Sequence, residues 1–273
     1  MNKISLRKPA VAGQFYPGTS QELKKQIERF LEGKPGQEDA LGCVLPHAGY
    51  IYSGRVAVET VSRIKIKEKI VLLGPNHTGF GADFSIMTEG AWLTPLGEVK
   101  IDSGLSQNIL QRSKYLKEDI SAHAYEHCLE VELPILQYFK ADFEIVPLVF
   151  LSDDLEVLKE IGREIASSIK ESNLQESTMI VASSDLTHYE PQGQAERKDQ
   201  EAIRAILELD ADKLMEKVRR LNISMCGYAP VITMLSATKA LGAKKAVLVR
   251  YQTSGEVTQD MAAVVGYAGI IIY

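Results

Sequence analysis

The histidines of this chain lie in segments whose residues could do chemistry. His47, His77 and His188 each follow an apolar run that ends in a turn, in the segments LGCVLPHAGY, IVLLGPNHTGF and MIVASSDLTHY. A neutral imidazole can bind a metal ion or move a proton. Ligands of open α/β sheets bind in the crevice at the carboxyl ends of the strands. The three segments therefore predict one shared pocket at that edge of a sheet.

The first two of these segments suggest a metal site. Pro46 and Gly49 form a turn around His47, which by itself fits a core histidine bonded to backbone better than a ligand. A second histidine, His77, follows the next strand, and the two together fit a metal site as well as a structural role. GPNHTGFG lacks the GK[ST] and G-x-G-x-x-G patterns of phosphate loops, so it gives little support to nucleotide binding.

The third segment, SSDLTHY, adds a carboxylate. Asp185 lies three residues before His188, so it could orient the imidazole or act with it as an acid/base pair. Serine and aspartate are also typical of helix starts. Ser183 or Ser184 could therefore cap a helix while Asp185 points into the pocket.

The segment HAYEHCLEVELP contains the other two histidines. His123 and His127 are four residues apart and would share one face if the segment is helical, as would His127 and Glu130. The spacing is not HExxH, so a zinc-protease site is excluded. His127, near the expected helix start, could donate a proton or stabilise an oxyanion. His123 fits an exposed polar residue as well as a functional one.

Cys226 lies in the turn MCGYAP before an expected helix, where a thiolate could be a metal ligand or a nucleophile and a thiol could be a small buried side chain. Cys43 and Cys128 are expected to be buried in a strand and a helix. The cysteines show no CxxC spacing and no signal-peptide pattern opens the chain, so we expect a cytoplasmic protein. Four tyrosines could line the pocket or pack in the core: Tyr50, Tyr52, Tyr189 and Tyr228.

The elements that must position these residues alternate along the chain. The patterns predict strands over residues 41–45, 70–73, 143–150, 178–182, 245–251 and 262–272, with short strands within 84–101. They predict helices over residues 21–31, 53–64, 104–111, 125–139, 155–170, 194–207, 211–219 and 231–241. The first two strands should be parallel and the last two antiparallel. This order predicts one α/β domain over residues 1–273, with a mixed central sheet and helices on both faces.

Composition excludes some classes of function. Hydrophobic residues make up 45% of the chain and charged residues 25%, which is typical of a globular core. A net charge of −5 argues against a nucleic-acid-binding surface, which would be basic. The apolar tail, residues 264–273, is much shorter than the roughly 20 residues that a membrane-spanning helix needs. The tail is therefore expected to be a buried strand.

Six segments, in order, resemble the Memo-like family, also called AmmeMemoRadiSam system protein B. They are RKPAVAGQFYPG, PHAGYIYSG, LGPNHTG, EHCLEVELPILQ, SSDLTHY and MCGYAPV. The resemblance implies a fold similar to the class III extradiol dioxygenases, which are non-haem iron enzymes. It implies metal ligands at His47, His77 and Cys226, and further pocket residues at Asp185, His188 and His127.

The third ligand sets this family apart from the dioxygenases, which use a carboxylate where this chain has Cys226. A thiolate favours copper(I) or alters the potential of iron. We expect iron(II), with copper or zinc as alternatives, and redox or oxygen chemistry on an unidentified substrate. One alternative is a zinc-dependent hydrolase, and another is a non-catalytic module that binds a peptide, a phosphopeptide or a protein. The resemblance also implies a radical-SAM protein and an AMMECR-type protein as partners.

Overall fold

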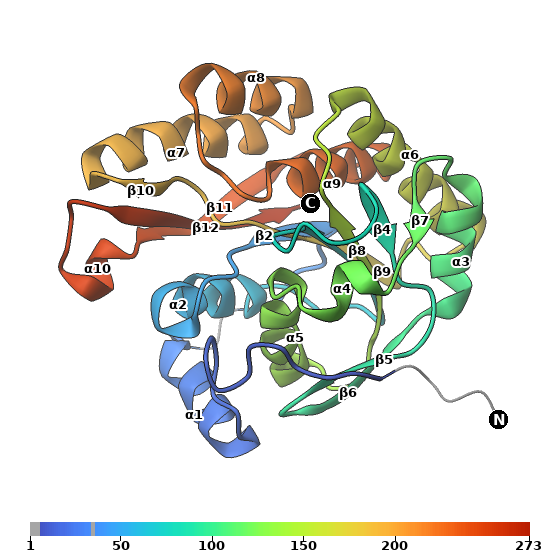
Figure 1. Ribbon diagram of the computed structural model, residues 1–273, viewed down its shortest axis with the longest axis horizontal. Coiled ribbons are helices and arrows are strands. Elements are labelled where there is room, and N and C mark those ends of the chain that lie inside the picture. The colour runs from blue at the N-terminus through green and yellow to red at the C-terminus, as the bar shows by residue number, and fades with distance from the viewer. Residues whose placement is uncertain (1–5, 34–35) are drawn as a thin grey trace.

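In the computed structural model, which describes residues 6–33 and 36–273, the strands join one mixed sheet of twelve strands (Figure 1). The first five residues, part of the N-terminal segment in which we expect no signal peptide, lie outside the described residues. The strands are β1 (Leu6–Arg7), β2 (Gly42–Leu45), β3 (Lys69–Pro75), β4 (Phe84–Ile86), β5 (Ala91–Thr94), β6 (Gly97–Ile101), β7 (Lys117–Glu118), β8 (Glu144–Phe150), β9 (Thr178–Ser183), β10 (His188–Glu190), β11 (Ala246–Thr253) and β12 (Val264–Ile272). The hydrogen-bonded order is β1-β5-β6-β8-β3-β9-β2-β12-β10, with β11 beside β12 and β4 joined to β7 and β8.

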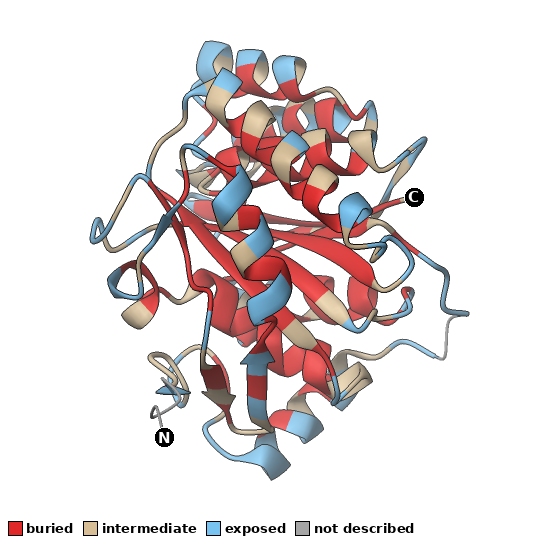
Figure 2. Cartoon of the chain, turned by 90° about the vertical axis from the view of Figure 1, so that its right-hand side faces the viewer, coloured by how far each residue is buried: buried red, intermediate tan, exposed pale blue. Residues whose placement is uncertain are grey.

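Helices cover both faces of the sheet. They are α1 (Ser20–Phe30), α2 (Tyr50–Val61), α3 (Ser103–Arg112), α4 (Ser121–Ala124), α5 (Cys128–Phe139), α6 (Leu155–Glu171), α7 (Gln192–Leu207), α8 (Ala211–Leu221), α9 (Tyr228–Ala240) and α10 (Gly255–Thr258). One apolar core contains side chains of α1, α2 and α5, and the other contains those of α3, α6, α7, α8 and α9. Figure 2 shows the central strands buried between these layers. The predicted α/β class with helices on both faces is confirmed.

Apolar spacing explains how the helices attach to the sheet. In α6 the buried residues Leu158, Ile161, Ile165 and Ile169 recur every three or four positions and form one stripe. The strands of the sheet centre are instead buried on both faces, so they read as continuous apolar runs. Most of the correctly predicted helices and strands were recognised by these two patterns.

Three parallel strands, β2, β9 and β3, lie side by side at the centre of the sheet. We expected β2 and β3 to be parallel, which they are, but β9 lies between them. The pairing aligns Leu45 of β2 with Ser183 of β9, and Leu73 of β3 with Ala182 of β9. The loops that follow the three strands therefore meet at the same edge of the sheet.

The predicted helix over residues 125–139 is wrong at its start. The chain forms a short helix, α4, that ends at Ala124, and α5 begins only at Cys128. Between them the Glu126 carboxylate accepts hydrogen bonds from the backbone N–H groups of His127 and Cys128, at 2.9 and 3.0 Å. N–H groups at a helix start have no partner inside the helix, and an acceptor there starts a new helix. His123 and His127 therefore do not share a helix face.

Two helices begin about one turn earlier than predicted: α2 at Tyr50 and α9 at Tyr228. Pro230 lies in the first turn of α9, where its missing N–H is not needed. Thr19 caps α1 and Asp154 caps α6.

The C-terminal strand is buried, as predicted. β12 pairs antiparallel with β11 on one side and with β2 on the other. Among the residues that the structure describes, every helix is too short or too polar to cross a bilayer.

The N-terminal segment is attached to α5 by one buried carboxylate. Glu130 is fully buried and accepts hydrogen bonds from the Arg7 guanidinium at 2.8 Å and the Tyr16 hydroxyl at 2.7 Å. It also accepts from the backbone N–H groups of Ala10 and Val11, at 2.8 and 3.0 Å. Because every partner is a donor, the carboxylate is ionised and pairs with Arg7. This cluster explains the segment RKPAVAGQFYPG as an attachment of the chain start to the core.

His123 is buried, so the exposed polar residue, one of the two roles that the sequence left open, is wrong. Its ring is fully buried 6.0 Å from the ring of Trp92, and Arg7 lies over the same indole at 4.1 Å. Neither ring nitrogen has a hydrogen-bond partner among residues 6–33 and 36–273. Burial lowers the pKa of His123 to about 3, and the nearby Arg7 charge adds to this shift. The side chain is therefore a neutral core residue.

We predict that His123 makes the fold sensitive to acid. The unfolded chain protonates this histidine near pH 6.5 and the folded chain does so only near pH 3, so its stabilising contribution is present above pH 6.5 and is lost as pH falls. Between pH 7 and pH 5 the loss should be about 2 kcal/mol. Urea unfolding of the wild type and of His123→Phe, which cannot titrate, checks this. An equal loss in both proteins would contradict it.

Candidate metal centre

Three possible metal ligands meet at the carboxyl edge of the central strands. His47 follows β2, His77 follows β3, and Cys226 lies directly before the N-cap of α9. Their ligand atoms all lie within 4.8 Å of one another. The Cys226 Sγ is 3.3 Å from the Nε2 of His47, and the two imidazole rings have centroids 5.2 Å apart.

This geometry fits a single ion. Nitrogen and thiolate ligands at about 2.0 and 2.3 Å from an ion lie about 3.1–3.6 Å apart at angles between right and tetrahedral. The distance between Cys226 and His47 falls in that range. Two imidazoles and a thiolate are a donor set that iron, copper and zinc all accept. The residues present therefore fit the metal that the family resemblance implies.

Glycine lets the Cys226 turn approach the sheet. A Cβ atom at Gly227 would lie 2.2 Å from the carbonyl oxygen of Ser183 and 2.5 Å from the Cβ of Ser184. Because real Cβ atoms do not come that close, only glycine permits this contact. Without the contact, Cys226 would lie further from the loops that carry the histidines.

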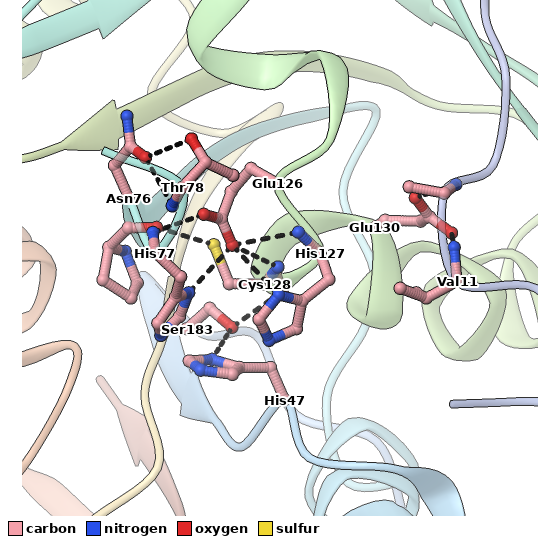
Figure 3. A network of polar contacts seen from close by, with 12 residues as sticks. Val11, His47, Asn76, His77, Thr78, Glu126, His127, Cys128, Glu130 and Ser183 are labelled. Carbon is pink, nitrogen blue, oxygen red and sulfur yellow. Dashed lines mark hydrogen bonds and ion pairs between the residues drawn. The ribbon is translucent and has the colours of Figure 1, made fainter. Parts of the chain in front are cut away.

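His77 has a buried carboxylate behind it (Figure 3). Glu126 is fully buried and its Oε1 lies 2.9 Å from the Nδ1 of His77, while its Oε2 accepts from the backbone N–H of His77 at 2.5 Å. Burial raises the pKa of Glu126, but the contacts with His77 and the N–H of Cys128 outweigh burial and hold it at about 2. The carboxylate can only accept, so the Nδ1 of His77 carries the proton and its Nε2 is free for a metal.

His47 has a neutral partner instead. Its Nδ1 lies 2.9 Å from the Ser183 hydroxyl, which is 2.7 Å from Glu132 and 2.9 Å from the carbonyl oxygen of Cys128. Burial raises the pKa of Glu132 well above its usual range, so this side chain is an acid. The Ser183 hydroxyl donates to the Glu132 Oε1 and to the Cys128 carbonyl oxygen, so its proton does not point at His47. The serine oxygen thus accepts the Nδ1–H of His47, and the Nε2 faces Cys226.

Asp185 and His188 lie beside the three ligands. The backbone N–H of His47 donates to Asp185 at 2.9 Å, and burial raises the pKa of Asp185 to about 6. The Nδ1 of His188 lies 2.9 Å from the carbonyl oxygen of Ser224, so this nitrogen donates and the Nε2 is left as an acceptor. No helix follows Ser183 or Ser184, so the expected capping role of these serines is wrong.

His127 also lies at the centre. Its ring centroid is 4.7 Å from that of His77 and 5.5 Å from that of His47, and Phe15 packs on it at 4.9 Å. Burial lowers the pKa of His127, so it is a neutral imidazole at pH 7. With Glu126 and His77 it forms a second group of possible ligands, but hydrogen bonds already link His77 to that carboxylate.

A cavity of about 460 Å³ opens over the centre. Phe15, Tyr52, Tyr189 and Tyr267 give it aromatic walls, and the lining also includes the four histidines other than His123. Tyr189 has φ of 58°, a left-handed conformation that is rare for an aromatic residue and that often marks a functional site. The lining contains no lysine or arginine among the described residues.

The remaining candidate residues lie elsewhere. Tyr50 is buried and donates to the backbone carbonyl of Val131, and Tyr228 donates to Asp153. Cys43 and Cys128 are buried in β2 and at the first position of α5, as predicted. Burial, together with the nearby charge of Asp185, raises the pKa of the Cys226 thiol.

Sequence reasoning missed Glu126 and Glu132. Glu126, Glu130 and Glu132 are all fully buried, although glutamate is usually exposed. The available signal was the position of these acids in and just before an otherwise apolar helix, EHCLEVELPIL.

Comparison with known proteins agrees with the resemblance seen in the sequence. A family model described as "Memo-like protein" matches residues 7–271. A MEMO1 family protein of Methanosarcina barkeri is 45% identical, over 98% of this chain and 100% of its own length. One of Aquifex aeolicus is 44% identical, over 98% and 99%. An uncharacterized protein of Escherichia coli K12 has the same fold, with a TM-score of 0.56 at 15% identity over 84% of this chain and 98% of its own. This chain therefore belongs to the Memo-like protein family.

Proposed function

We propose that this protein binds one redox-active metal ion, iron(II) or else copper, and uses it on a small molecule in the adjoining cavity. The observation that carries the proposal is the convergence of His47, His77 and Cys226 within 4.8 Å, with both histidines in the lining of that cavity. Three protein ligands leave coordination positions open, which is typical of catalytic rather than structural sites.

A bound iron or copper ion would supply electron transfer and oxygen activation. The chain itself supplies the groups that handle protons. His188 has a free Nε2 acceptor because its Nδ1 bonds to the Ser224 carbonyl, so it can take a proton from a substrate. Asp185, with a pKa of about 6, can hold or release a proton near neutral pH.

His127 has a different role in this proposal. A neutral imidazole can donate a hydrogen bond to a substrate oxygen without bringing a charge into the cavity. Phe15 packs on its ring and limits the ring's movement. The aromatic walls favour a substrate with a flat apolar part, and the absence of lysine and arginine from the described lining disfavours an anionic substrate.

Phosphopeptide binding has less support. Arg55 and Arg250, the basic residues nearest to the pocket segments in sequence, pair with Glu32 and Glu59 and do not line the cavity. The radical-SAM and AMMECR-type partners stay predictions from the family resemblance.

We predict that Cys226→Ala abolishes metal binding. Anaerobically purified wild type should contain about one iron or copper ion per chain, and the variant less than about a tenth of that. Elemental analysis measures both. Cys43→Ala, which removes a buried cysteine of β2 away from the cavity, is the matched control and should keep its metal. Wild type without metal would contradict the proposal, and wild type with zinc alone would favour the hydrolase alternative.

We also predict that metal binding becomes tighter as pH rises. Burial raises the pKa of Cys226, so the metal-free protein holds a thiol proton that a metal must displace. Affinity for cobalt(II), followed by absorption, should increase about tenfold per pH unit between pH 7 and pH 8.5. In Cys226→Asp the third ligand has already lost its proton, so the slope should be nearly flat. Equal slopes in both proteins would argue against Cys226 as a ligand.

A further inference from the structure

We propose that Glu126 is a positioning residue that holds His77 in its metal-binding orientation and supplies the charge that makes the centre prefer a divalent ion. This inference rests on the proposed metal-binding function. It concerns a residue that sequence reasoning missed.

The hydrogen bonds of Glu126 define its charge. Its two oxygens accept from the backbone N–H and the Nδ1 of His77, and from the backbone N–H groups of His127 and Cys128, at distances from 2.5 to 3.0 Å. Three of these four partners are backbone N–H groups, which can only donate, so the surroundings favour the ionised form over the acid. The residue is therefore a carboxylate, although it is fully buried.

The same contacts fix the ring of His77. One carboxylate bonds both the backbone N–H and the ring Nδ1 of this residue, so it fixes the ring relative to the backbone. A carboxylate behind a histidine fixes the tautomer and increases the basicity of the other nitrogen. The Nε2 then keeps a lone pair for an ion shared with Cys226 and His47.

Helix capping alone does not explain the residue. A serine, threonine or asparagine would satisfy the N–H groups at the start of α5 equally well. None of these would reach the Nδ1 of His77 and also carry a negative charge. The carboxylate is also favoured by the partial positive charge of the helix start, but its contact with the ring of His77 points to the histidine as a second target.

The two histidine ligands have different partners. His47 bonds through its Nδ1 to the Ser183 hydroxyl, which is neutral. The nearest carboxylate oxygen of Asp185 lies 4.0 Å from the Nε2 of His47, beyond hydrogen-bond range. Among the residues that the structure describes, Glu126 is thus the one carboxylate bonded to the ring of a proposed ligand.

This difference between the partners of the two histidines sets the net charge of the metal centre. A divalent ion bound by the Cys226 thiolate is left with one positive charge, which Glu126 neutralises. Copper(I) bound in the same way would be neutral together with the thiolate, so the negative charge of the buried Glu126 would stay uncompensated where water screens poorly. Ionised Asp185 would add to that excess, because it lies beside His47. The centre should therefore favour iron(II) over copper(I) relative to a site without Glu126.

The test is Glu126→Gln, assayed with iron(II) alone and copper(I) alone by anaerobic competition with chelators. The amide oxygen can still accept from His77, but the amide NH2 replaces the other acceptor oxygen, so the variant removes the charge together with one acceptor. Iron(II) affinity should fall about 10- to 100-fold and copper(I) affinity by no more than about threefold. Glu59→Gln is the matched control, because Glu59 is a buried glutamate paired with Arg250 outside the cavity lining. Both affinities of the control should stay within about twofold of wild type.

A second variant distinguishes the loss of charge from a general disturbance of the fold. Glu126→Asp retains the charge but reaches less far, so both affinities should fall while their ratio stays near that of wild type. Equal losses of iron(II) and copper(I) in Glu126→Gln would overturn the role of charge. Unchanged affinities in both Glu126 variants would overturn the positioning role. If the wild type binds neither ion, the proposed function itself fails, which is a distinct outcome.

Discussion

The side-by-side parallel arrangement of β2, β9 and β3 is the constraint on which the rest of this structure depends. Parallel neighbours in register end at one edge, so the segments after them must share the space beyond it. The histidines that follow β2 and β3 come within reach of each other across β9, because the three strands end at nearly the same level. The same strand brings Ser183 and Asp185 to the edge. The turn before α9 then closes over it with Cys226, at a separation that only Gly227 allows.

Helix α5 and the residues before it stabilise this edge from one side of the sheet. They contain three buried glutamates, and the free-energy cost of burying each one is reduced in a different way. Glu126 is ionised and surrounded by N–H donors, Glu130 is ionised and paired with Arg7, and Glu132 is neutral beside Ser183. An isolated buried charge would be costly, so these contacts stabilise the fold. The geometry of the proposed metal centre and the stability of the fold therefore depend on one hydrogen-bonded network.

Much of the fold could be predicted because it depends on local pattern. Continuous apolar runs identified the buried strands, and residues spaced three or four apart identified helices such as α6. The start of α5 could not be predicted this way. The sequence around Tyr125 and Glu126 is compatible with a helix, and the break depends on a carboxylate that folds back on the chain. The burial of His123 was also inaccessible, because the packing of its ring against Trp92 joins segments far apart in the chain.

The sequence alone determined which residues could do chemistry and that three of them follow strands, since the type and order of residues are local properties. It could indicate His47, His77 and Cys226 as a set only through resemblance to a family. The tertiary structure decided that their ligand atoms meet, that Glu126 lies behind one histidine and Ser183 behind the other, and that the cavity walls are aromatic. The reason is physical. Charge state and orientation depend on neighbours in space and on exclusion of water, and neither is encoded in the spacing of residues along the chain.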